Sequence, residues 1–222
     1  MLRDFSTVLF DLDGTLIDST DLILASYRHT MREHLGQNPP DYKWLETIGR
    51  PLRVQLEDFA SDSAEAEAMM ATYRAHNHEV HDDLVRPFQG IRGVLDDLRS
   101  NGAVLGIVTS KHALGTELGL RACELESDWF GTIVTSDSVE EYKPHPRPVL
   151  AALEDLGVPP GEDVLFIGDS VHDMRSGRAA GVSTGAAVWG PYEAPGLESF
   201  EPDYWLHSIA ELRALVLTES KD

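Results

Sequence analysis

The chain is poor in cysteine and in basic residues, and each shortage excludes a class of protein. Cys123 is the single cysteine, so no intramolecular disulfide can form. Lysine and arginine together number 18 against 38 aspartates and glutamates, which leaves a formal net charge of −20. This charge repels DNA, RNA and anionic membranes, so we expect no nucleic acid partner. A small anionic substrate would need a few well-placed cations or a metal ion.

Long hydrophobic runs are also missing from the 222 residues. No apolar stretch approaches the ~18 residues that a membrane-spanning helix needs. The first ten residues include Asp4 and lack the apolar centre of a signal peptide. We therefore expect a cytoplasmic protein without a membrane partner, either a monomer or a weak homodimer.

The sequence alternates short apolar runs with helical patterns. Helical spacing of apolar residues occurs in 91–98, before Gly102, and in 150–156, before Gly157. Runs that are too short for a helix and rich in strand formers occur at residues 7–10, 104–108, 132–135, 164–167 and 184–188. Strands that alternate with helices of this length predict an α/β fold, a doubly wound and mostly parallel sheet.

One region interrupts the alternation after the first strand. Ile23, Tyr27, Met31 and Leu35 form an apolar stripe at helical spacing, and 51–60 and 63–81 also indicate helices. We predict a core of residues 1–15 and 87–222 with an inserted, all-helical cap domain of residues 16–86. Helices inserted here would lie over the carboxyl ends of the strands, where open α/β sheets bind ligands. We expect a mobile lid with hinges near Ile17 and Arg86.

Polar residues follow four of the predicted strands. The segments are Asp11-Leu12-Asp13-Gly14-Thr15, Thr109-Ser110-Lys111, Lys143-Pro144 and Gly168-Asp169-Ser170-Val171-His172-Asp173. Each segment alone has a structural explanation: a turn, a helix cap, a solvated lysine, or an acid in the first turn of a helix. Only four lysines are present, however, and two of them fall in these loops. Paired acids at a strand end can supply a nucleophile and a proton-transfer group.

Taken together and in this order, the four segments resemble the haloacid dehalogenase (HAD) superfamily. The similarity covers the whole chain and includes a helical cap of the C1 type. Within the superfamily, the chain is similar to the phosphoglycolate phosphatase branch. Three segments resemble the bacterial HAD pyrophosphatases in particular: Tyr73-Arg74-x-x-Asn77-His78-x-x-His81-Asp82-x-Leu84-Val85, Thr7–Ile17 and Val139–Pro146.

The resemblance implies a Mg²⁺-dependent phosphohydrolase that acts on a small phosphorylated metabolite through an aspartyl-phosphate intermediate. Asp11 would be the nucleophile and Asp13 the acid and base. The resemblance assigns Mg²⁺ to Asp11, the Asp13 carbonyl oxygen and Asp169, with Asp173 holding a bound water. Lys143 and Thr109 would complete the catalytic set, and Ser110 would bind the phosphoryl oxygens. We also count Gly14, Thr15 and Lys111 among the candidate substrate-binding residues.

The sequence leaves the substrate open. Arg50, in the predicted loop Thr47–Leu52, is the cation that could meet a second anion, such as the carboxylate of phosphoglycolate or the second phosphate of pyrophosphate. A sugar phosphomutase of the same fold is the alternative, with Arg50 and Arg53 binding its second phosphate. A phosphonate-cleaving enzyme would need Lys43 as a nucleophile. His76, His78 and His81 lie close together, but His76 and His78 do not share a helical face, which disfavours a metal site.

Overall fold

The computed structural model describes residues 5–190 and 202–216. The remaining parts of the predicted core, residues 1–4, 191–201 and 217–222, lie outside this range. None of the helices in the described part is long and apolar enough to cross a membrane. The helices are α1 Thr20–Leu35, α2 Tyr42–Leu45, α3 Leu52–Glu57, α4 Ser63–Glu79, α5 His81–Leu84, α6 Ile91–Ser100, α7 Ala113–Ala122, a 3₁₀ turn Ser127–Trp129, α8 Arg147–Leu156, α9 Val171–Ala180 and α10 Ile209–Val216. The strands are β1 Thr7–Phe10, β2 Ile17–Asp18, β3 Arg86–Pro87, β4 Val104–Val108, β5 Thr132–Val134, β6 Val164–Gly168, β7 Ser183–Ala187 and β8 Tyr204–Leu206.

Six strands form one sheet in the order β5-β4-β1-β6-β7-β8, and every pairing in it is parallel. The predicted α/β fold is therefore confirmed. Phe10, the last residue of β1, pairs with Ile107 of β4 and Ile167 of β6. Because these three strands end in register, the loops that follow them open at the same edge of the sheet.

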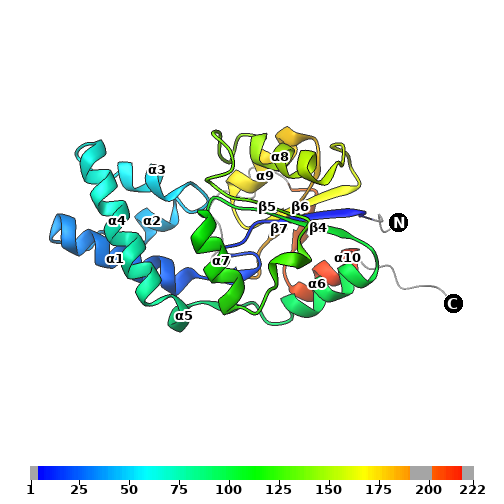
Figure 1. Ribbon diagram of the computed structural model, residues 1–222, viewed down its shortest axis with the longest axis horizontal. Helices are drawn as coiled ribbons and strands as arrows, with labels where there is room; N and C mark the ends of the chain where they lie inside the picture. Colours follow the sequence, from blue (N-terminus) through cyan, green and yellow to red (C-terminus); the bar gives the residue numbers. More distant parts are fainter. Residues whose placement is uncertain (1–4, 191–201, 217–222) are drawn as a thin grey trace.

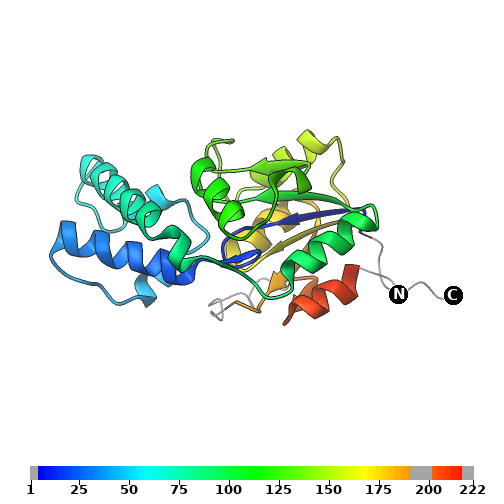
Figure 2. The same ribbon diagram turned by 60° about the horizontal axis from the view of Figure 1, so that its bottom comes forward.

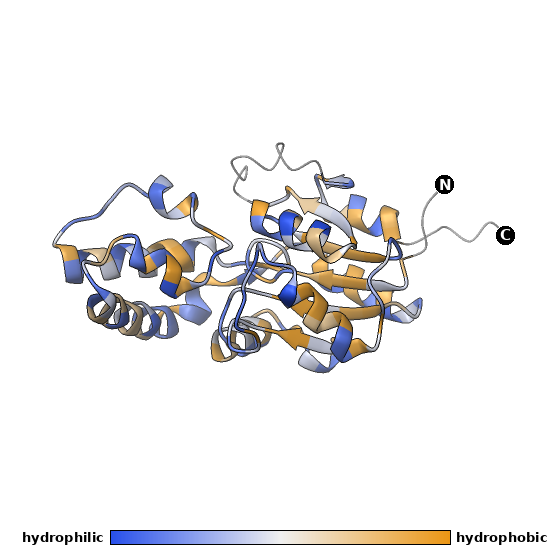
Figure 3. Cartoon of the chain, turned by 90° about the horizontal axis from the view of Figure 1, so that it is seen from above, coloured by the Kyte–Doolittle hydropathy of each residue, from blue (hydrophilic) through white to orange (hydrophobic). Residues whose placement is uncertain are grey.

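Each face of the sheet has its own layer of helices (Figure 1). Val8 and Phe10 point to one face, where they pack with apolar residues of α6, α7 and α10. Leu9 points to the other face and packs with α8 and α9. This alternation follows from the two-residue period of a strand. β1 is buried on both faces, as is typical of a central strand in a parallel sheet. Colouring by hydropathy shows the apolar strands inside and more polar helix surfaces outside (Figure 3).

The helices α1 to α5 form a separate lobe beside the sheet (Figures 1 and 2). The predicted stripe packs into an apolar cluster of its own: Tyr27 and Met31 are fully buried, and Ile23 and Leu35 pack against them. Two short strands connect this lobe to the sheet. β2 and β3 pair antiparallel, with Ile17 opposite Pro87. The predicted hinge residues Ile17 and Arg86 both lie in this two-stranded connection.

Several elements differ from the sequence prediction. β8 and α10 were not predicted. β8 is only three residues long, which is too short to show a period. α3 is shorter than the predicted helix 51–60, and the predicted helix 63–81 is divided at Val80 into α4 and α5. α6 ends at Ser100 with Asn101 as its cap, before the left-handed Gly102. Leu16, which the prediction assigned to the cap, is fully buried in the apolar cluster of the core.

Candidate active site

Four loops at the carboxyl edge of the sheet bring the predicted site residues together. Asp11 follows β1, Thr109 follows β4 and Asp169 follows β6, while Lys143 lies in the loop between β5 and α8. Since β5, β4, β1 and β6 are consecutive in the sheet, these loops are spatial neighbours. The strand order therefore assembles residues that are separated by more than 150 positions in the sequence.

Lys143 is at the centre of this group and is only 1% exposed. Its Nζ lies 3.1 Å from Asp11 Oδ1 and donates to Asp173 Oδ1 at 2.6 Å. Burial lowers the pKa of a lysine, but the two carboxylates outweigh this effect and leave the pKa of Lys143 raised. Lys143 is therefore a permanently charged group that holds two acids in place.

Asp173 also stabilises the start of α9. Its Oδ2 accepts from the Ser170 amide at 3.0 Å and from Ser170 Oγ at 2.6 Å, and Ser170 caps the helix in return. The alternative that Asp173 stabilises the first turn of a helix is thus correct, and it is compatible with the ion pair to Lys143. With both oxygens of Asp173 engaged, Asp11 and Asp169 have the more available carboxylates.

Asp11, Asp169 and Asp173 each place a carboxylate oxygen within 4.8 Å of the other two. Asp169 Oδ1 is buried and has no hydrogen-bond partner among the described residues. Asp11 Oδ1 accepts from the Leu12 amide at 2.7 Å. Burial, with the neighbouring acids, raises the pKa of Asp11 to about 7 despite Lys143, and it raises the pKa of Asp169 as well. This cluster of hard oxygen ligands fits a divalent cation, which would favour the ionised carboxylates.

Gly14 is required for this cluster. Its φ of +78° lies in the left-handed region, and a Cβ at this position would come within 2.0 Å of Asp169 Oδ2. The turn Asp11–Thr15 can therefore approach the Asp169 loop only with glycine at position 14. Thr15 lies behind this turn, with its carbonyl oxygen accepting from Trp189 Nε1 and its hydroxyl buried without a partner in the described chain.

Asp13 is held by contacts separate from those of the acidic cluster. Lys111 Nζ donates to both of its carboxylate oxygens, at 2.8 and 3.0 Å, and Ser19 Oγ donates to Oδ1 at 2.5 Å. Burial raises the pKa of Asp13, but the ion pair with Lys111 and these hydrogen bonds outweigh it and leave the pKa lowered. Two adjacent acids thus have opposite pKa shifts, the pattern expected when neighbouring carboxyls have different roles.

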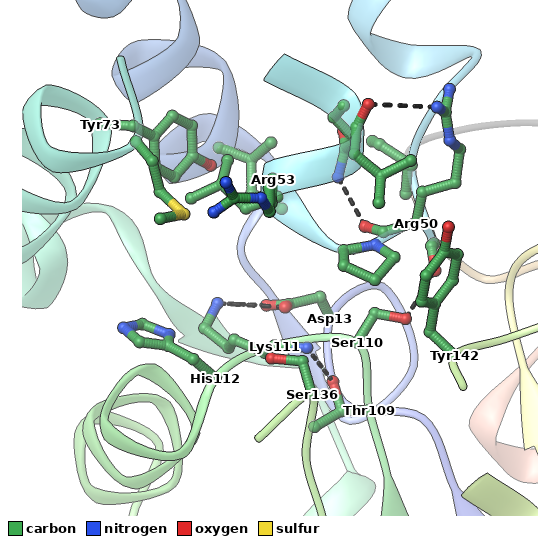
Figure 4. Close-up of a pocket in the computed structure, with 18 of the residues that line it drawn as sticks. Asp13, Arg50, Arg53, Tyr73, Thr109, Ser110, Lys111, His112, Ser136 and Tyr142 are labelled. Atoms are coloured by element: carbon green, nitrogen blue, oxygen red, sulfur yellow. Dashed lines mark hydrogen bonds and ion pairs between the residues drawn. The ribbon is translucent and has the colours of Figure 1, made fainter. Parts of the chain in front are cut away.

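A cavity of about 350 Å³ lies between the cap and the core, in front of Asp11 and Asp13. Of the predicted residues, Arg50, Thr109, Ser110 and Lys111 also line it. Figure 4 shows Tyr73 and Arg53 on one side of this cavity, with Asp13, Lys111 and His112 on the other. Gly14, Thr15, Lys143, Asp169 and Asp173 are not part of the cavity wall and lie behind it.

The cap touches the core at the loop that contains Arg50. Ser110 Oγ donates to the carbonyl oxygen of Gly49 at 2.6 Å. A Cβ on Gly49 would lie 2.6 Å from Ser170 Oγ, so the loop packs closely against the start of α9. Arg50 itself is paired with Asp58, at 2.7 Å, and donates to the carbonyl oxygen of Val54. Its charge is therefore shared with another cap residue.

The cap histidines do not assemble into one group. His76 stacks on His29 with ring centroids 4.3 Å apart, His78 stacks on His112 of the core at 5.9 Å, and His81 pairs with Asp82. Among the residues that the model describes, the acidic cluster is the one group of three metal-ligand side chains. The three histidines therefore serve three different contacts.

The residues of the cavity wall that sequence reasoning missed include Tyr73 and Arg74 of α4, and His112 at the start of α7. The only signal was the resemblance of the segment that begins at Tyr73 to the pyrophosphatases. His112 directly follows Lys111, but nothing in its sequence context indicated that it meets the cap. Contacts between two domains leave little trace in the local sequence.

A family model for haloacid dehalogenase-like hydrolases matches residues 8–187. The chain belongs to this family. Pyrophosphatase PpaX of Bacillus velezensis is 40% identical over 208 residues, which cover 93% of this chain and 94% of that protein. A candidate phosphoglycolate phosphatase from Lactobacillus plantarum superposes with a TM-score of 0.85 at 27% identity and covers 96% of this chain and 99% of its own. A candidate HAD-like hydrolase from Bacteroides fragilis reaches a TM-score of 0.86, also at 27% identity, over 94% of this chain and 100% of its own.

These comparisons confirm the HAD assignment from the sequence. The chain is an enzyme of the HAD phosphatase type. The four segments that the sequence singled out all fall within the matched region. The two solved structures cover 94% and 96% of this chain, so their structural similarity to it includes both the sheet and the cap.

Proposed function

We propose that this enzyme is a Mg²⁺-dependent phosphohydrolase that removes phosphate from a small metabolite with two anionic groups, and that pyrophosphate is its substrate. The observation that carries the proposal is the position of Asp11. This residue lies at the front of a cluster of three carboxylates and one buried lysine, and it lines a cavity with cationic walls. The 40% identity to a pyrophosphatase supports the choice of substrate.

The metal site in this proposal consists of the carboxylates of Asp11 and Asp169 with the carbonyl oxygen of Asp13, and Asp173 orients a bound water. The unpartnered Oδ1 of Asp169 supports this assignment. Mg²⁺ at this position would neutralise charge on the phosphoryl oxygens. It would also keep Asp11 ionised, against the burial that raises the pKa of this residue.

In the first step, a carboxylate oxygen of Asp11 attacks phosphorus, and the bond from phosphorus to the leaving oxygen breaks. Asp13 gives a proton to that oxygen. In the second step, Asp13 takes a proton from water, the water oxygen attacks phosphorus, and the aspartyl-phosphate bond breaks to release phosphate and Asp11. Lys143, Thr109 and the amide of Ser110 hold the phosphoryl group during both steps. The pairing of Asp13 with Lys111 favours the ionised form that the second step requires, whereas the first step requires Asp13 to be protonated against this pairing.

We assign the cap, residues 16–86, the role of a lid that closes over this site and contributes Arg50 to the substrate cavity. The contact between Ser110 and Gly49 supports this role, because it joins the phosphate-binding loop directly to the cap. Closure limits the access of bulk water during transfer to Asp11, and opening releases phosphate. A sugar phosphomutase would use the same core groups, but no observation in the cap favours a sugar.

The experiment that tests the proposal compares kcat/KM for pyrophosphate, phosphoglycolate, a set of sugar phosphates and p-nitrophenyl phosphate. Each is measured with Mg²⁺, with excess EDTA, and with Ca²⁺ in place of Mg²⁺. We expect pyrophosphate to be the preferred substrate, EDTA to abolish hydrolysis and Mg²⁺ to restore it. Ca²⁺ should substitute poorly because its coordination shell is larger. Full activity in excess chelator would remove the metal from the mechanism, and a preference for a sugar phosphate would overturn the assigned substrate.

A further inference from the structure

The wall of the cavity between cap and core contains an arginine for which the described residues provide no hydrogen-bond acceptor or carboxylate partner. Arg74 lies on α4, and its Nε is buried without a hydrogen bond. Among the described residues, no carboxylate forms an ion pair with its guanidinium. Arg74 is half-buried in the cavity wall, and a buried Nε without an acceptor is uncommon, because losing its hydrogen bond to water costs free energy.

The other two arginines of the cavity wall differ from Arg74 in this respect. Arg50 pairs with Asp58 and bonds to the carbonyl oxygen of Val54. Arg53 pairs with Glu57 and Glu67. A substrate anion would have to compete with these acids for either residue, whereas Arg74 can bind an anion without losing an existing contact.

The groups around Arg74 are themselves hydrogen-bond donors or cations. Arg74 and His78 are one helical turn apart on α4, and His78 stacks in parallel with His112 of the core. Burial, followed by the charges of Arg74 and Lys111, lowers the pKa of His112 to about 4. The nearby acid is Asp137, whose Oδ2 accepts from the Ala113 amide at the start of α7. Both imidazoles thus lie in a locally positive environment.

Lys111 connects this environment to the reacting groups. Its Nζ donates to both oxygens of Asp13, the proposed acid for the leaving oxygen. Lys111, His112 and Arg74 all line the cavity. An anion held by these three residues would share Lys111 with Asp13, and it would therefore lie beside the leaving oxygen.

We propose that Arg74, Lys111 and His112 form a subsite for the anion that is not transferred, and that Arg74 contributes more to binding it than Arg50 does. The inference rests on the proposed phosphohydrolase function, and it explains how the enzyme would select substrates that carry a second anion. The chemistry is that of an oxyanion attached to the leaving oxygen: the second phosphate of pyrophosphate, or a carboxylate one carbon away. Because Arg74 belongs to the cap and the other two residues to the core, the anion bridges the two lobes. The planar guanidinium can bind two oxygens of either anion at once.

The test measures binding to an Asp11→Asn protein, which separates the subsite from turnover. Calorimetry in saturating Mg²⁺ gives the Kd of imidodiphosphate, of 3-phosphonopropionate and of orthophosphate. We expect Arg74→Gln to weaken imidodiphosphate by about 10- to 100-fold, the effect of losing a charge-assisted, two-point contact, and to change orthophosphate by less than about threefold. Arg74→Lys should recover part of the loss. A larger effect on 3-phosphonopropionate than on imidodiphosphate would identify the carboxylate as the natural anion of this subsite.

Arg53→Gln is the matched control, since it removes an arginine of the same cavity that already has acidic partners. It should change the Kd of imidodiphosphate by less than about threefold, and Arg50→Gln should have an intermediate effect because Arg50 is shared with Asp58. Without ligand, Arg74→Gln should melt at or slightly above the wild-type temperature, because it loses no ion pair. The rise in Tm on adding imidodiphosphate should shrink in this variant.

An equal loss of orthophosphate and imidodiphosphate affinity in Arg74→Gln would overturn the subsite, as would a smaller effect than that of Arg50→Gln. A fall in the ligand-free Tm of this variant would assign Arg74 a structural role instead. If the wild-type enzyme hydrolysed neither pyrophosphate nor any phosphate ester while imidodiphosphate binding still depended on Arg74, the proposed function would fail and the subsite would stand.

Discussion

The core and the cap bury polar groups in different ways. In the core, Lys143 is surrounded by Asp11 and Asp173, and Asp173 is held further by Ser170. In the cap, stacked aromatic rings fill the interior: the Tyr27 and Trp44 centroids are 4.6 Å apart. Tyr27 Oη and Trp44 Nε1 are buried there without a hydrogen-bond partner among the described residues. The core therefore positions charges, whereas the cap is held together by apolar contacts.

This difference indicates how the two lobes divide the work. Reacting groups need fixed positions, which buried and mutually paired charges provide. The cap can vary its surface without disturbing them, because its own stability depends on the aromatic cluster and not on the site. The cap should accordingly affect which substrate reacts, and the core whether any substrate reacts.

The largest expected effect tests the core alone. Asp11→Asn should lower kcat by more than ~10⁴-fold, because the amide has nearly the same shape but is not a nucleophile. Asp13→Asn should cost about 10²–10⁴-fold through lost proton transfer. Both variants are assayed with pyrophosphate after circular dichroism confirms that they fold. Activity of Asp11→Asn within tenfold of wild type would exclude it as the nucleophile.

Lys143→Met tests whether the paired charges around Lys143 also stabilise the core. Removing the lysine leaves Asp11 and Asp173 buried without their cation, which should cost about 3–5 kcal/mol of unfolding free energy. For a protein of this size that corresponds to a fall in Tm of roughly 10 °C. The matched control is Arg147→Met, which removes an exposed pair with Glu154 and should shift Tm by less than about 2 °C. Equal shifts in the two variants would contradict the structural role of Lys143.

Gly49→Ala breaks the contact between the two lobes. Gly49 has a φ of +93°, and its Cβ would clash with Ser170 Oγ, so the cap could no longer close fully. We expect kcat/KM for pyrophosphate to fall about tenfold, equivalent to ~1.4 kcal/mol. Gly36→Ala is the control, since Gly36 also has a positive φ but a Cβ there meets no atom within 4 Å. Both variants should lose similar stability, and only Gly49→Ala should lose activity. A comparable loss of kcat/KM in both would show that backbone strain, not closure, is responsible.

The smallest expected effect compares one buried hydroxyl in each lobe. Tyr27→Phe removes a hydroxyl without a partner and should leave the unfolding free energy unchanged or raise it by about 1 kcal/mol. Thr132→Val removes a hydroxyl of β5 that donates to Asp155 Oδ2 at 2.8 Å, and should lower it by about 1 kcal/mol. Denaturant titration at equal m-value measures both. Destabilisation by Tyr27→Phe to the same extent as by Thr132→Val would show that the cap interior satisfies its polar groups after all.

The sequence by itself determined the sheet, the helical insertion and the convergence of Asp11, Thr109, Lys143 and Asp169. Periodicity identifies central strands, and parallel strands end at a common edge, so the residues after them lie on the same side of the sheet; the strand order then makes these loops neighbours. Short edge elements such as β8 were missed because three residues carry too little periodicity to recognise.

Only the tertiary structure decided which cations face the substrate cavity. The sequence favoured Arg50, yet the folded cap pairs this residue with Asp58, whereas Arg74 has no acidic partner in the part of the chain that the structure describes. It also brings Lys111 to Asp13 and His112 to His78. These contacts depend on how the helices of the cap pack and on how the cap is placed against the sheet. Both are set by side chains far apart in the chain, and no local pattern encodes them.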